Sequence, residues 1–180
     1  MIIRDRHGSR GSRIWPMMVA VLCMGATELM GQYFGRNKVQ YEQFDFKETQ
    51  TPHFRVFHYT TEGPAIRDAV KMLERWHERQ AAVFGDSLGP NQPVVIYANH
   101  ADFQQTNISG GLIPQGTGGF TESRANRIVL PLTGVYADND HVLGHELTHA
   151  FHYRIMKESR RKMRGGRGIP LWFIEGMAEY

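Results

Sequence analysis

The segment DHVLGHELTHAFHYRIMKESRRK, residues 140–162, predicts one long helix that carries reactive groups on one face. Apolar residues such as Val142, Leu143, Leu147 and Phe151 recur at helical spacing along it. Asp138 or Asn139 is expected to cap this helix at its N-terminus, and the glycines between residues 165 and 168 to end it. The remaining elements are predicted to pack around this helix.

The pentapeptide HELTH, residues 145–149, has the form HExxH. A four-residue step on a helix turns by about 40°, so the imidazoles of His145 and His149 lie on one face, one turn apart. Two neutral ring nitrogens can therefore bind one metal ion. Glu146 lies about 100° round from His145, beside the metal rather than on it. We expect two histidine ligands and a general base at Glu146, which takes a proton from water.

A third ligand has to come from another part of the chain, because catalytic zinc sites use three protein ligands and leave a place for water. Pro170 precedes a second predicted helix in LWFIEGMAEY, residues 171–180. Glu175 on this helix follows His149 after 25 intervening residues, enough for the chain to turn and return across the first helix. We predict Glu175 as the third ligand, and Glu179 as a carboxylate that accepts a hydrogen bond from a ligand histidine.

His141 and His152 are competing candidates, because both lie near His145 on the helical wheel. Either is expected to line the cleft or to replace a ligand. A metal pair of His149 with His152 would leave Glu146 without a role, which disfavours it. The metzincin spacing fails, since His152 stands where that pattern has glycine.

The glycine-rich segment, residues 110–119, lacks the Gly-Lys-Ser/Thr ending of a phosphate-binding loop. We expect no nucleotide there. Instead an extended peptide substrate is expected to add to an edge strand, either Gly118–Thr121 or Ile128–Leu130, with Gly118 and Gly119 lining the cleft.

The rest of the pattern predicts an α+β domain with a small mixed sheet packed on the HExxH helix. Strands are expected at residues 39–46, 54–59, 93–98 and 126–132, a helix at 64–84 that stops at Gly85, and a helical turn from an Asn99 cap through residue 103. Pro131 cannot donate to a strand ladder, which favours an edge or strand-end position for its segment.

Composition agrees with one globular domain: 180 residues, 41% hydrophobic and 22% charged. The net charge is +3, and seven lysines and arginines gather between Arg154 and Arg167. Because the basicity is local, no nucleic-acid partner is predicted.

Residues 1–31 differ from the rest of the chain. Four arginines lead into the uncharged run IWPMMVAVLCMGA, residues 14–26, whose 13 residues match the core of a signal peptide and are short of the roughly 20 that span a bilayer. We predict a signal peptide and an exported protein, periplasmic or extracellular, with a membrane anchor and envelope association as the alternative. The single cysteine, Cys23, lies in this segment, so the metal must be held by histidine and carboxylate in a processed chain.

HELTHA followed by LWFIEGMAEY resembles the gluzincin group of zinc metallopeptidases, the thermolysin-like and aminopeptidase-like families. This resemblance implies a zincin-like fold with Glu175 as third ligand and Glu179 as the supporting carboxylate. The segments NKVQYEQFDF, HADFQQTN and VLPLTGVYADNDHVLGHELTHAFHY are similar to the peptidase-MA-like domain found ahead of Tol-type β-propellers in exported bacterial proteins. The similarity covers most of residues 37–180 and implies a helical subdomain and a propeller beyond Tyr180.

Residues 32–180 are therefore expected to be a zinc metallopeptidase domain, incomplete at its C-terminus, that hydrolyses a peptide or protein substrate. The oxyanion-stabilising His or Tyr that gluzincins carry downstream of the third ligand has no match in the chain. The alternative is a catalytically inactive, zinc-stabilised binding or scaffold module of an exported propeller protein.

Overall fold

The computed structural model describes residues 38, 40–59, 63–85, 88–162 and 169–179. The predicted signal segment, residues 1–31 with Cys23, lies outside them. The described chain forms a mixed α+β fold around one five-stranded sheet, which confirms the predicted α+β class with a mixed sheet. Within these ranges no helix is long and apolar enough to cross a membrane.

The sheet has the strand order β1-β2-β3-β5-β4. Its strands are β1 (Lys47–Gln50), β2 (Phe54–His58), β3 (Gln92–Tyr97), β4 (Phe120–Glu122) and β5 (Arg127–Pro131). The three central strands β2, β3 and β5 run parallel, and the outer strands β1 and β4 pair antiparallel to their neighbours. The edge strand β4 matters most for the site.

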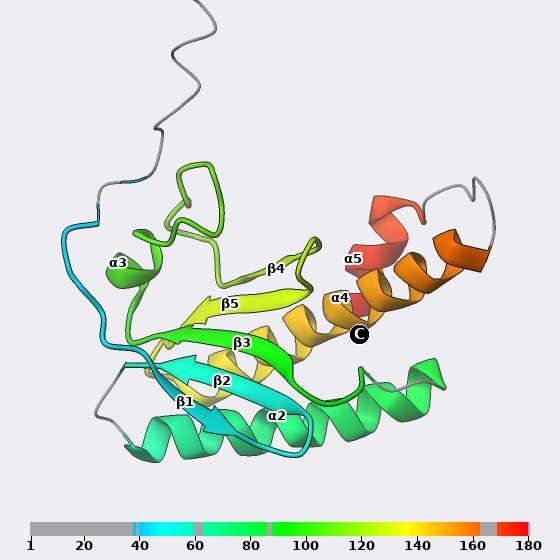
Figure 1. Ribbon diagram of the computed structural model, residues 1–180, viewed down its shortest axis with the longest axis horizontal. Helices are drawn as coiled ribbons and strands as arrows, with labels where there is room; N and C mark the ends of the chain where they lie inside the picture. The colour runs from blue at the N-terminus through cyan, green and yellow to red at the C-terminus, as the bar shows by residue number, and fades with distance from the viewer. Residues whose placement is uncertain (1–37, 39, 60–62, 86–87, 163–168, 180) are drawn as a thin grey trace, which may run out of the picture. The chain divides into compact units, whose positions relative to one another are not determined.

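Four helices in the described part of the chain accompany the sheet: α2 (Gly63–Phe84), α3 (His100–Phe103), α4 (Tyr136–Lys162) and α5 (Leu171–Glu179). Helices α2 and α4 pack together on one face of the sheet (Figure 1). The core between them contains fully buried side chains of both helices and of the central strands, among them Val56, Leu73, Ile96, Leu130, Leu143, Leu147 and Phe151. This core holds one side of α4 against the sheet and leaves its histidine-bearing side for other contacts.

Several local predictions are confirmed. Helix α2 matches the predicted span and is followed by Gly85 at φ +62°, a conformation that favours glycine. Asn99 caps α3, because its side chain accepts a hydrogen bond from the backbone N–H of Asp102. These features depend on residues close in sequence.

The predicted strand at residues 39–46 is wrong, since the first strand is β1, four residues long and further on. The aromatic residues of this segment pack against other rings instead of forming a strand. The ring centroids of Phe44 and Tyr59 are 4.5 Å apart, and the backbone N–H groups of Tyr41 and Glu42 donate to the side chain of Gln105. An aromatic cluster and a side-chain acceptor thus replace strand pairing.

The predicted helix start is also wrong, because α4 begins at Tyr136 rather than near residue 140. Asn139 does not cap the helix. Its side-chain oxygen accepts hydrogen bonds from the backbone N–H of Thr133, at 2.9 Å, and from the Thr133 hydroxyl, at 3.1 Å. The backbone N–H of Val135 donates to the same hydroxyl, so the preceding loop is closed early enough for the helix to start sooner.

Ile128–Leu130 is not an edge, which corrects one of the two strands proposed for substrate binding. These residues belong to β5, which is paired with β3 on one side and with β4 on the other. Pro131 is the last residue of β5, so only the strand-end part of its prediction is confirmed. Of the two segments proposed for substrate binding, Gly118–Thr121 reaches an edge of the sheet, because its last residues belong to the outer strand β4.

Gly144→Ala is expected to destabilise the domain by about 1–3 kcal/mol, reduced somewhat by the higher helix propensity of alanine. An added Cβ would lie 2.6 Å from Cε2 and 2.8 Å from Cδ2 of Trp76. The indole is held in place, since its N–H donates to Asp140 at 2.9 Å. Urea denaturation of the metal-free protein measures the change.

Gly176→Ala is the matched control, because Gly176 lies in α5 with nothing within 4 Å of its added Cβ. This variant is expected to be neutral or more stable. Equal effects of the two substitutions would contradict the packing of α2 against α4 through Trp76.

Candidate metal centre

Helix α4 carries His145, Glu146 and His149 near its middle, as predicted. Helix α5 lies alongside α4 (Figure 1) and buries Ile174 and Ala178, one turn apart. Glu175 and Glu179 each follow one of these buried residues, so their carboxylates lie on the same face of α5, one turn apart.

The two helices bring His145, His149 and Glu175 together. The Nε2 atoms of the two histidines are 3.0 Å apart, and Oε2 of Glu175 lies 3.7 Å from Nε2 of His145 and 3.5 Å from Nε2 of His149. One ligand atom from each residue falls within 4.8 Å of the others. Among the residues that the structure describes, these three form the group that can hold a metal ion.

The ring nitrogens are suited to binding a cation. Burial, and then His145 beside it, lower the pKa of His149, so its imidazole is neutral and offers a lone pair. Oε1 of Glu179 lies 3.1 Å from Nδ1 of His145. A proton on that Nδ1, donated to Glu179, leaves the Nε2 lone pair directed to the group of ligand atoms.

Glu146 is buried beside this group but is not part of it, with 5% of its surface exposed. The hydroxyl of Thr121, in β4, lies 2.8 Å from both Oε2 and the backbone oxygen of Glu146. Burial raises the pKa of Glu146 to about 7, the Thr121 hydrogen bond opposes the rise, and the Glu175 carboxylate adds to it. The side chain can therefore exchange a proton near neutral pH.

The two other histidines of α4 lie outside the group of ligand atoms. His141 is exposed, with Nε2 at 3.8 Å from Oε2 of Glu179. His152 is only 2% exposed, and its ring stands nearly perpendicular to Phe84 at 5.2 Å. The ring centroids of His152 and His149 are 6.3 Å apart, so the structure does not bring them together as a ligand pair.

Gly118 and Gly119 lie against α4 where the chain enters β4. A Cβ at Gly119 would meet Cγ of Glu146 at 3.2 Å, and one at Gly118 would meet Cγ2 of Val142 at 3.1 Å. The absence of side chains here allows the edge strand to run directly beside Glu146.

Thr121 is the site residue that the sequence analysis missed. It fell within a predicted edge strand, but nothing local relates a threonine in a strand to a glutamate 25 residues later. Strand alternation was the one available signal, because Gly119 and Thr121 lie on the same face of the segment. The face that lies against α4 at Gly119 is therefore also the face from which the Thr121 hydroxyl reaches Glu146.

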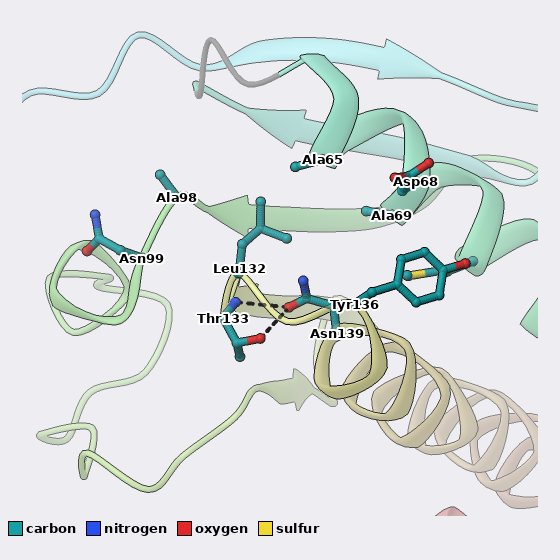
Figure 2. Close-up of a pocket in the computed structure, with 11 residues that line it drawn as sticks. Ala65, Asp68, Ala69, Ala98, Asn99, Leu132, Thr133, Tyr136 and Asn139 are labelled. Carbon is teal, nitrogen blue, oxygen red and sulfur yellow. Dashed lines mark hydrogen bonds between the residues drawn. The ribbon is translucent and has the colours of Figure 1, made fainter.

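A separate pocket of about 410 Å³ lies at the first turn of α4. Figure 2 shows Ala65 and Ala69 of α2 above it, with Thr133 and Asn139 joined by their hydrogen bonds on the opposite side. None of the predicted site residues lines this pocket. The group of ligand atoms and the pocket are thus different places on α4.

Comparison of the chain with known protein families and with curated proteins found no match. The resemblance of HELTHA and LWFIEGMAEY to gluzincins stays a prediction.

Proposed function

We propose that this chain is a zinc metallopeptidase of the gluzincin type, with a zincin-like fold, in which His145, His149 and Glu175 hold Zn²⁺. The observation that carries the proposal is the convergence of their three ligand atoms next to the buried Glu146. Two imidazoles and one carboxylate are a donor set of catalytic zinc sites, and three protein ligands leave one position for water.

The spacing of the ligand atoms supports zinc. Tetrahedral bonds of about 2.0–2.1 Å separate neighbouring ligand atoms by about 3.3 Å. The three separations in the protein, 3.0, 3.5 and 3.7 Å, bracket that distance. Nitrogen ligands also favour zinc over calcium or magnesium, which take oxygen.

Glu146 supplies the proton transfers in this proposal. Bound zinc supplies Lewis acidity, which activates a water molecule and polarises the scissile carbonyl. Glu146 takes a proton from the attacking water and passes it to the departing amine, a role suited to a pKa of about 7. The Thr121 hydroxyl, 2.8 Å from its carboxylate, keeps the base in place.

The edge strand β4 is the proposed substrate platform. It pairs with β5 on one side, and no other described strand pairs with its outer side. An extended peptide added along Gly118–Thr121 would form backbone hydrogen bonds beside Glu146, because the Thr121 hydroxyl contacts that side chain and a Cβ at Gly119 would lie 3.2 Å from its Cγ.

Glu179→Ala is expected to weaken zinc affinity by about 10–100-fold, because it removes the acceptor of the His145 Nδ1 proton. Competition with a calibrated chelator measures the affinity. His141→Ala is the control, since Nε2 of His141 lies 3.8 Å from Oε2 of the same carboxylate but His141 is outside the ligand group, so zinc affinity is expected to stay unchanged. Equal affinities for Glu179→Ala and the wild type would refute the supporting role of Glu179.

The proposal is tested by zinc analysis of the purified full chain and by incubation with a mixed peptide library, with and without chelator. The expected result is one zinc ion per chain and cleavage that stops when the chelator is added. Folded protein that binds no zinc overturns the proposal. Stoichiometric zinc without cleavage overturns the peptidase assignment and favours the scaffold alternative.

A further inference from the structure

The two ligand histidines differ in what supports their second ring nitrogen. Nδ1 of His145 faces Glu179 at 3.1 Å. Nδ1 of His149 is buried and has no hydrogen-bond partner among the described residues. Histidines that bind a metal through Nε2 almost always donate the Nδ1 proton to a carboxylate, a carbonyl or a water molecule. The described residues therefore provide no acceptor for the Nδ1 proton of His149.

His152 is a second buried polar group beside it. The side chain is 2% exposed, and neither ring nitrogen has a hydrogen-bond partner in the described part of the chain. Its surroundings include the perpendicular Phe84 ring. Since an unsatisfied polar atom in the interior is costly, a phenylalanine or leucine would fill this position at lower free energy. A polar partner for His152 would remove that cost.

We propose that His152 is a positioning residue for His149 and is connected to its Nδ1 through one buried water molecule. This inference rests on the proposed zinc site. The ring centroids are 6.3 Å apart, too far for a direct N–H···N bond and consistent with two hydrogen bonds of about 2.8–3.0 Å in series. Buried waters typically join polar atoms that otherwise have no partner.

The direction of the hydrogen bonds follows from the metal. His149 offers the Nε2 lone pair to zinc, so Nδ1 carries the proton and donates it to the water. The water donates to a lone pair of His152, which is neutral because an unpaired buried cation would be too costly. His149 is then held against rotation, as Glu179 holds His145, but from the α2 side of the helix, where His152 contacts Phe84.

His152→Phe in the full chain tests the inference. The expected result is a zinc affinity about 10–100-fold weaker than that of the wild type, measured by chelator competition. The metal-free variant is expected to unfold at the same temperature or higher, because phenylalanine removes the ring nitrogen of His152 that the water does not reach and that has no partner among the described residues. A purely structural histidine would give the opposite pattern, with lower stability and unchanged affinity.

His100→Phe is the matched control, because His100 also has a buried ring nitrogen without a partner but lies in α3, away from the ligand group. Zinc affinity is expected to stay at the wild-type value. His152→Gln, which keeps a donor and an acceptor, is expected to recover part of the affinity lost in His152→Phe.

Imidazole ¹⁵N spectra of the zinc-loaded wild type provide a readout that needs no folded variant. A slowly exchanging proton on Nδ1 of His149, hydrogen-bonded to water, is expected. Rapid exchange of that proton, or wild-type zinc affinity in His152→Phe, overturns the inference while the zinc site stands. Failure of the wild type to bind zinc overturns both.

Discussion

Glu146→Gln will lower the rate of peptide hydrolysis by about 10²–10⁴-fold, while one zinc ion per chain stays bound. Glutamine has the shape of glutamate and still offers an oxygen to the Thr121 hydroxyl, 2.8 Å from Oε2 in the wild type, but it cannot accept a proton from water. The ligand atoms of His145, His149 and Glu175 are untouched. Initial rates on a peptide identified from the library, together with zinc content, measure both effects.

Glu158→Gln is the matched control for this variant. Glu158 lies on the same helix, is partly exposed and forms an ion pair with Arg154 at 3.5 Å. The same chemical change there is expected to leave hydrolysis unchanged, because exposed ion pairs contribute little. Hydrolysis by Glu146→Gln at the wild-type rate would exclude Glu146 as the base and with it the proposed mechanism.

His149→Ala will lose both zinc and hydrolysis. Nε2 of His149 is the ligand atom closest to both others, 3.0 Å from His145 and 3.5 Å from Glu175. Zinc affinity is expected to fall by more than about 100-fold, beyond the effect of removing a supporting group. Zinc at 100 times its dissociation constant stabilises a folded protein by about 2.7 kcal/mol, so thermal unfolding with and without zinc shows the loss directly.

His141→Ala provides the comparison for His149→Ala on the same helical face. His141 is exposed and outside the ligand group, so its removal is expected to preserve the zinc-dependent rise in unfolding temperature. Stoichiometric zinc binding by His149→Ala, with an unchanged rise, would show that the metal is held elsewhere.

Local features of the fold followed from the sequence. The span of α2, the Gly85 stop and the Asn99 cap depend on residues within a few positions of one another. The strand predicted at residues 39–46 failed because alternation of aromatic and polar residues also suits a segment that packs on the sheet without pairing. The predicted start of α4 was wrong because the side-chain oxygen of Asn139 accepts hydrogen bonds from the backbone N–H and the hydroxyl of Thr133 instead of capping the helix.

The arrangement of His145, Glu146 and His149 could be predicted without a structure, because a helix sets the angle and rise between residues four positions apart. The packing of the elements then established that Glu175 meets the two imidazoles, that β4 is the edge strand and that the Thr121 hydroxyl contacts Glu146. Glu175 lies beyond a turn, and Thr121 lies in a different layer of the fold. Such positions depend on strand order and on how α4 and α5 pack. The spacing of 25 residues made Glu175 a candidate ligand, but it does not fix that packing or the strand order.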